Sequence, residues 1–214
     1  MHRRALLSTV AAAGAAGLGG CLASVGIGTS GPANPVDDEE RRISLLGVDS
    51  VPDESGLQID VRVLDDRITV SETAEIVVET TVVGDTTVLP VTQGSCAILN
   101  RRTCSSAPRG LWLESTDGAG GTATPDGEGW VRRGLPTGEQ GFGGYGCRRV
   151  EYQPGESVRN TFAVWDDGRV DGYLDPGEYR WGEDVSVRSA SSDSEEFRGF
   201  DWGFSLELTR VERE

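Results

Sequence analysis

The 214-residue sequence contains no lysine and a single histidine, His2. All 20 basic residues are therefore arginines, set against 35 aspartates and glutamates. A Ser-His-Asp or Cys-His site needs a histidine as its general base, and histidine metal clusters need several. Because His2 lies in an N-terminal segment that reads as a targeting signal, the chain beyond residue 20 can build none of these sites.

A long apolar run and a CxxC motif are also missing. The most apolar stretch, residues 5–20, is short for a membrane span and consists largely of Ala and Gly. Without CxxC spacing, the four cysteines do not indicate a zinc site. We therefore predict no transmembrane helix and no zinc centre.

The first residues, MHRRALLSTVAAAGAAGLGGCLAS, have the composition of an export signal. Arg3 and Arg4 precede the mildly apolar run, and Cys21 follows Leu18 and two glycines. Narrow side chains beside the scissile bond suit a signal peptidase that attaches lipid to the next cysteine. We predict a signal peptide over residues 1–20 and a lipid on Cys21, the alternative being a plain signal without lipid.

These residues resemble the twin-arginine lipoprotein signals of halophilic archaea. The resemblance implies export of an already folded domain. It also implies a location outside the cytoplasm, on the outer face of the cell membrane, with the lipid on Cys21 as the anchor.

The acidic charge points to the same habitat. The formal net charge is −15, and removal of residues 1–20 with Arg3 and Arg4 leaves −17. Repulsion of this size loosens a fold at low salt, whereas at molar salt the Debye length is about 3 Å. We interpret the surface as adaptation to brine; the alternative is an acidic protein that binds cations or basic partners. The sign of the charge disfavours nucleic acid.

Beyond the signal, the sequence divides into a linker and one domain. Residues 21–42 lack an apolar period and mix Gly, Ser and Pro with a charge run, which is typical of a flexible linker. Residues 43–214 follow as a single domain, long enough for one hydrophobic core. We therefore expect a lipid-anchored linker carrying a folded domain.

Apolar and polar residues alternate through most of that domain. In LQIDVRV, Leu57, Ile59 and Val61 fall on one face and the polar residues on the other. Many short strands separated by Gly and Pro predict an all-β antiparallel sandwich. The expected strands are Ile43–Val48, Leu57–Val63, Ala74–Val83, Thr86–Val91, Leu111–Glu114, Trp130–Arg133, Arg148–Tyr152, Val158–Trp165, Tyr179–Val187 and Trp202–Val211.

Two glycine-rich segments interrupt this pattern between residues 115 and 147. Loops of such length are functional or mobile. Phe142 and Tyr145 at the tip of the second segment are candidates for contact with a partner, or for packing back on their own domain.

A Pro-Gly turn occurs twice near the end of the chain, in QPGES at 153–157 and in DPGEY at 175–179. Pro presets φ and Gly accepts a positive φ, so both predict a type II turn before a strand. With VRNTFAVWDDG and WGFSLEL, this pair resembles the immunoglobulin-like domain of intracellular proteinase inhibitor-like proteins. The resemblance implies an immunoglobulin-like sandwich, a fold that serves many functions.

With Cys21 lipidated, three cysteines remain: Cys96, Cys104 and Cys147. An exported protein meets oxidising conditions, which favour one bridge and leave one thiol over. Cys96 with Cys104, either of them with Cys147, and free buried thiols all remain open.

The stretch DDGRVDGYLDPGEYRW, residues 166–181, resembles a calcium loop in its acidic spacing. However, Arg169 occupies the third position, where calcium needs an oxygen, and Pro176 stands where a helix would begin. We predict a strand connection ending in a type II turn. The alternative is an irregular calcium site built from Asp167, Asp171 and Asp175.

No catalytic motif is present, and we expect no catalytic residues, metal or cofactor. Carboxylate pairs such as Asp65 with Asp66 and Asp166 with Asp167 are expected on the surface of so acidic a chain. We predict a binding or envelope-associated module, held to the membrane through Cys21, whose partner is an envelope protein or a glycan. The alternatives are a carboxylate-dependent extracellular hydrolase and an inhibitor of an exported protease.

Overall fold

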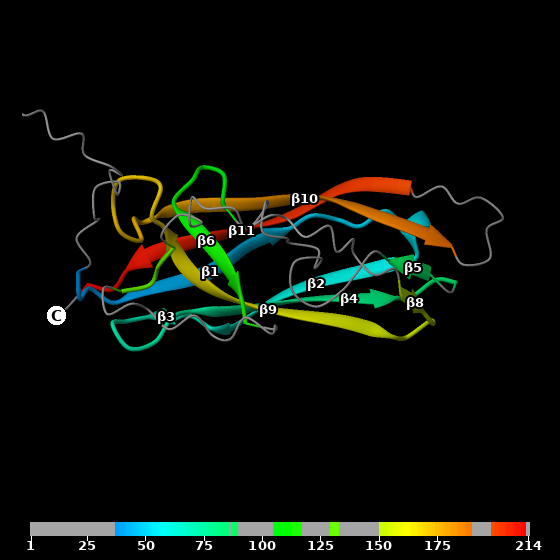
Figure 1. The fold of residues 1–214 in the computed structure, drawn as a ribbon, viewed down its shortest axis with the longest axis horizontal. Helices are drawn as coiled ribbons and strands as arrows, with labels where there is room; N and C mark the ends of the chain where they lie inside the picture. The colour runs from blue at the N-terminus through cyan, green and yellow to red at the C-terminus, as the bar shows by residue number, and fades with distance from the viewer. Residues whose placement is uncertain are drawn as a thin grey trace, which may run out of the picture. The chain divides into compact units, whose positions relative to one another are not determined.

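A computed structural model describes residues 37–85, 87–89, 105–116, 129–132, 150–189 and 198–212. These residues form eleven strands and one short 3-10 helix, η1 (Asp53–Ser55) (Figure 1). No helix within these ranges is long and apolar enough to cross a membrane. The strands are β1 Arg41–Val48, β2 Leu57–Asp65, β3 Arg67–Ile68, β4 Glu75–Val82, β5 Thr87–Leu89, β6 Leu111–Ser115, β7 Val131–Arg132, β8 Val150–Tyr152, β9 Ser157–Asp167, β10 Gly177–Ser189 and β11 Arg198–Arg210.

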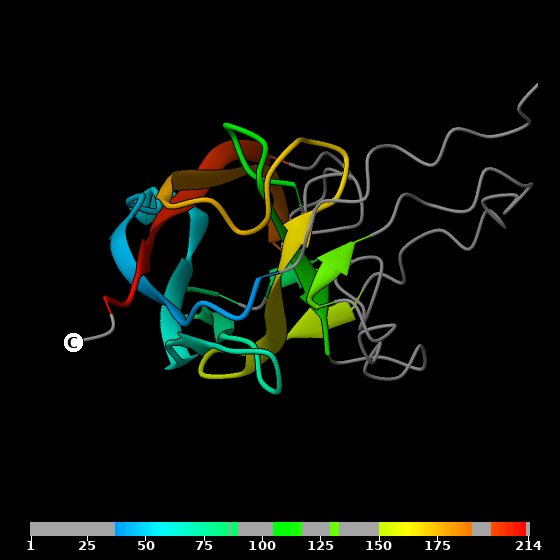
Figure 2. The same cartoon turned by 90° about the vertical axis from the view of Figure 1, so that its left-hand side faces the viewer.

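The strands form two sheets. Sheet I has the order β3-β1-β11-β10-β5-β8, and sheet II has the order β2-β4-β9-β6. Neighbouring strands along both paths are antiparallel, whereas the two-residue β7 pairs with β9 in parallel. Figure 2 shows the two layers end-on. The all-β prediction, with two packed antiparallel sheets, is confirmed.

Each of the ten expected strands overlaps an observed one. In β2 the alternation is as predicted, with Leu57, Ile59 and Val61 buried and the residues between them exposed. β3 has only two residues and gave no periodic signal in the sequence. In β4, Val77 is 1% exposed although the alternation places it on the outer face.

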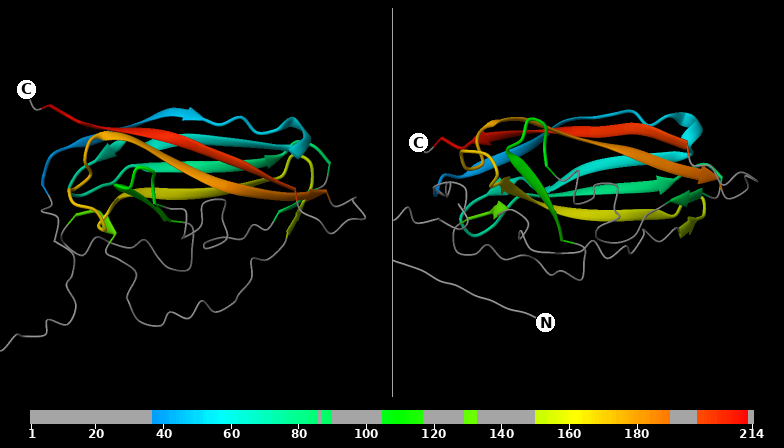
Figure 3. Two further views of the ribbon diagram at one scale, coloured as in Figure 1. Left: turned by 90° about the horizontal axis from the view of Figure 1, so that it is seen from above. Right: turned by 45° about the horizontal axis from the view of Figure 1, so that its top comes forward.

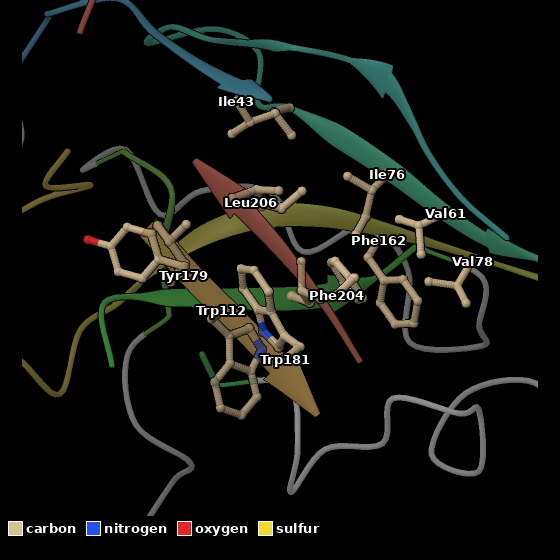
Figure 4. Close-up of a cluster of buried hydrophobic side chains, with 14 of the residues drawn as sticks. Ile43, Val61, Ile76, Val78, Trp112, Phe162, Tyr179, Trp181, Phe204 and Leu206 are labelled. Carbon is tan, nitrogen blue, oxygen red and sulfur yellow. The ribbon is translucent and has the colours of Figure 1, made fainter. Parts of the chain in front are cut away.

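The core lies between the sheets, and its aromatic residues from sheet I are Tyr179, Trp181, Trp202 and Phe204. Trp181 of β10 stacks on Phe204 of β11, with ring centroids 5.4 Å apart. Figure 4 shows Phe204 and Leu206 from this sheet facing Ile76 and Phe162 from sheet II. Burial of these side chains, at about 1.5–3 kcal/mol for each, is the main force that holds the layers together.

Both ends of the domain lie at the same end of sheet I. Arg41 of β1 pairs with Arg210 of β11, and the Val211 amide donates to the Glu40 carbonyl. Arg41 and Arg42 therefore belong to the first strand, although the sequence analysis placed them in the linker.

The two Pro-Gly turns differ. Gly155 has φ +87°, and the Glu156 amide donates to the Gln153 carbonyl at 2.9 Å, as the turn prediction requires. Gly177 is instead the first residue of β10, opposite Leu208, and it is not among the described glycines with positive φ. The predicted type II turn at 175–178 is therefore wrong, because β10 starts before the turn could form.

Candidate functional site: the β9–β10 connection

Residues 168–176 connect β9 to β10, and the buried charged side chains of the described residues lie around this connection. Asp166 and Asp167, the last residues of β9, are 2% and 0% exposed, and Arg41 from the first strand is 1% exposed. Ionised groups are this deeply buried only when other groups satisfy them. The connection is therefore the place where polar interactions shape the domain.

Arg41 fixes the start of the domain to this connection. Its guanidinium donates to the carbonyls of Tyr173 (3.0 Å) and Leu174 (2.8 Å), and it binds the Asp37 carboxylate through two bonds of 2.6 and 2.7 Å. The guanidinium carbon also lies 5.1 Å from the Tyr173 ring centre. We call Asp37, Arg41, Tyr173 and Leu174 the junction.

The same contacts shift the ionisation of the Asp37 carboxyl. The hydrogen bond from Arg41 is the largest cause, and it holds the pKa of Asp37 below its ordinary value against a smaller opposing effect of burial. Asp37 and Arg41 are thus both charged near neutral pH, and together they form a partly buried ion pair.

Asp166 holds the backbone of the connection in an unusual shape. Its Oδ2 accepts a hydrogen bond from the Leu174 amide at 3.0 Å. Leu174 has φ +46° and Gly172 has φ +106°, values that place both residues in the left-handed region. A leucine stays there only when its surroundings fix it, and the Asp166 carboxylate and Arg41 do so from two sides.

Two side chains, Arg169 and Ser105, bind the carboxylate of Asp167. Arg169 donates to its two oxygens at 2.6 Å each, and the Ser105 hydroxyl donates at 2.7 Å. Burial alone raises the pKa of Asp167, but the bonds from Arg169 and Ser105 outweigh burial and keep the pKa below its ordinary value. Asp167 is therefore an ionised structural carboxylate.

An aromatic cluster continues from Asp167 along sheet II. Trp112 of β6 lies opposite Trp165 of β9, and its ring is approached by the guanidinium groups of Arg169 (5.1 Å) and Arg132 (5.4 Å). The Trp112 indole N–H donates to Glu114 at 3.0 Å, and Glu114 is also 3.2 Å from Arg132. Cation–π contacts and ion pairs thus cover Trp112, which is 5% exposed.

The calcium hypothesis does not fit this geometry. Asp167 gives both carboxylate oxygens to Arg169, while Asp175 is exposed. Within the described ranges, no group of three or more His, Cys, Asp or Glu side chains is placed to hold a metal ion. A strand connection is present as predicted, although it spans only residues 168–176 and lacks the type II turn, and the Arg169 guanidinium binds the Asp167 carboxylate there.

The other predicted site residues fall into two groups. Asp65 and Asp66 are part of the β2–β3 corner, where they accept hydrogen bonds from the Arg67 amide and from Arg42. The remaining ones lie outside the described residues, namely Arg3, Arg4, Cys21, Cys96, Cys104, Phe142, Tyr145 and Cys147.

Sequence analysis missed Arg41, the residue that organises the junction. A signal was present, because Arg41 precedes Ile43 by two positions and so shares its inward face by the strand period. We assigned Arg41 to the linker because it follows a charge run, DDEE, that reads as solvent-exposed.

No family model, curated protein or solved structure matches this chain.

Proposed function

We propose that this protein is a lipid-anchored, extracytoplasmic binding module of a halophile, associated with the cell envelope and without catalytic activity. Export and anchoring rest on Arg3, Arg4 and the LGGC sequence that ends at Cys21. The bound partner is an envelope protein or a glycan, and nucleic acid is disfavoured by the charge.

The observation that carries the proposal is the junction. The linker reaches the domain at Asp37, and there the Arg41 guanidinium ties the incoming chain to Tyr173 and Leu174, more than 130 residues away in sequence. A pull on the linker is therefore transmitted to both sheets rather than to a frayed strand end. This suits a domain that is displayed on a tether and holds a partner under load.

The alternative of a carboxylate-dependent hydrolase gains no support from the Asp166–Asp167 pair. A general acid needs a raised pKa, whereas the pKa of Asp167 is lowered by Arg169 and Ser105. The inhibitor alternative rests on the family resemblance alone, and most of the glycine-rich segments through which an inhibitor would act lie outside the described residues.

Anchoring is tested by replacing Cys21 with Ser in the native host. The variant should appear in the medium or remain an unprocessed precursor, and the matched control Ser24→Ala should stay with the membrane. Recovery of a mature-length Cys21→Ser chain in the membrane fraction contradicts the lipid anchor.

Binding is tested by crosslinking intact envelopes at native salt and recovering the protein with its partners. One stoichiometric envelope protein or glycan, retained by wild type and lost when Cys21→Ser is released, supports the module. Formation of a sugar or peptide product by the purified protein contradicts it.

A further inference from the structure

β2 ends sheet II with an open edge. It pairs with β4 on one side. On the other side, no backbone group of the described residues bonds to residues 58–64, and the next backbone bond is that of the Ile43 amide of β1 to the Asp66 carbonyl. Figure 3 shows β2 outermost in its sheet, next to β4. A free edge of this kind presents N–H and C=O groups that can pair with another strand.

The usual protections are weak along this edge. Residues 57–65 contain no proline, and the inward-facing Leu57, Ile59 and Val61 carry no charge that would oppose pairing. One bulge occurs, but it lies after Val63 and leaves the strand regular up to that residue. By contrast, β1 is paired on both sides, with β11 through a ladder that has a bulge between Leu45 and Gly47, and with β3 at Arg41 and Arg42.

On the outer face of β2, Asp60 has no cationic partner among the described residues. Asp60 lies directly opposite Glu79 of β4, a like-charge pair. Glu79 is compensated by Arg62 (2.6 Å) and Arg159 (3.3 Å), whereas the one described partner of the Asp60 carboxylate is the Gln58 side-chain amide (2.8 Å). Asp60 thus lacks a cation at the open side of the sheet.

We propose that β2 is an interface between two copies of this chain, paired antiparallel about a two-fold axis at Val61. In that register, Asp60 of each copy lies opposite Arg62 of the other, so two opposite-charge pairs form from residues of one strand. The two β2 strands then join both copies of sheet II into one continuous sheet.

Charge selects this register among the symmetric ones. An axis at residue 60 sets Asp60 against its own copy, and an axis at residue 62 does the same with Arg62, so both place like charges together. Axes at residues 59 and 63 leave Asp60 and Arg62 without opposite charges. A two-fold antiparallel pair is also closed, because each edge is used once and no fibre follows.

Two exposed leucines near the open edge of β2 are consistent with a second copy that covers this edge. Leu64, at the end of β2, is 55% exposed, and Leu46 of β1 is 48% exposed. β1 and β2 come close together at this side of the sandwich, because the Ile43 amide of β1 donates to the carbonyl of Asp66, the residue after β2, at 2.8 Å. Pairing at Val61 brings Leu64 of one copy beside Gln58 of the other and removes part of this surface from water.

The test uses the full chain with Cys21→Ser, to avoid lipid, in molar sodium chloride, where repulsion between two acidic copies is screened. Sedimentation velocity up to about 0.1 mM measures the dissociation constant. Three forms are compared: the parent, Asp60→Arg and Arg62→Asp. Each substitution turns both cross-copy pairs into like-charge pairs, and we expect the dissociation constant to rise about tenfold or more.

The decisive sample is a mixture of the two variants. The Asp60→Arg copy has two arginines and the Arg62→Asp copy has two aspartates, so they attract only each other, and a heterodimer of parent-like affinity should form. A folding defect cannot produce this rescue. A monomeric parent, variants that still self-associate, or a mixture that stays monomeric each overturns the proposal.

Discussion

The junction and the open edge of β2 are built from the same residue types, arginine and aspartate, yet they use them differently. At the junction, Arg41 is 1% exposed and each of its bonds is to a group of its own chain. At the β2 edge, Asp60 and Arg62 are exposed; Arg62 contacts Glu79 of its own chain at 2.6 Å, whereas Asp60 lies opposite a like charge. Buried charge in this domain therefore contributes to stability, whereas the exposed charge of β2 is available to the dimer proposed above.

The largest expected effect is at the junction. Arg41→Met leaves two carbonyls and the Asp37 carboxylate without their donor, and we expect a loss of about 3 kcal/mol in the free energy of unfolding. Chemical denaturation in molar salt measures it. Arg42→Met is the control, because Arg42 is half exposed and its pair with Asp66 should contribute under about 1 kcal/mol. Equal losses of unfolding free energy in Arg41→Met and Arg42→Met contradict the claim that the buried arginine stabilises the domain more than the exposed one.

The next effect is at Asp167. Asp167→Asn removes the charge that binds Arg169 and Ser105, and we expect a loss of about 2 kcal/mol at pH 7. The folded pKa of Asp167 lies below the ordinary aspartate value of 3.8, so this stability is present above that pH and is lost as pH falls through the folded pKa.

The difference between wild type and Asp167→Asn should therefore narrow in denaturation experiments below pH 3.8. Asp66→Asn, in an exposed pair, is the matched control and should show little difference at any pH. If the stability difference between wild type and Asp167→Asn stays constant below pH 3.8, Asp167 does not act through its charge.

Salt affects the whole surface more than any one contact. With −17 on the chain after residue 20, as the charge of −15 and the loss of Arg3 and Arg4 require, dilution withdraws screening and increases self-repulsion. We expect the thermal midpoint to fall when sodium chloride is lowered from molar to dilute. A flat or rising midpoint removes the halophile interpretation.

The smallest expected effect is that of Asp60→Asn, which should not destabilise the domain. In the monomer, Asp60 faces Glu79 across the ladder, so Asp60→Asn should leave stability unchanged or raise it by up to about 0.5 kcal/mol. Denaturation at low protein concentration, where copies are separate, measures this. A clear loss of stability in Asp60→Asn means that Asp60, like Asp167, stabilises the folded monomer, which contradicts the difference drawn between the two carboxylates.

Strand positions could be predicted from the sequence because burial on one face imposes a period of two, and β2 and β10 follow it. The junction could not be predicted, because an arginine after a charge run reads as solvent-exposed until a second segment is known to cover it. The start of β10 at Gly177 was also missed, because pairing with β11 overrides the preference of Pro-Gly for a turn. The pairing of the cysteines stays a prediction, since all of them lie outside the described residues.

Hydrogen exchange measured at rising protein concentration in molar salt tests the contrast most directly. Amides of the junction, including that of Leu174, should be protected at every concentration, because their partners are in the same chain. Amides of β2 should exchange faster in dilute samples and gain protection as copies associate. Protection of β2 that does not depend on concentration, or a junction whose protection rises together with it, contradicts the account.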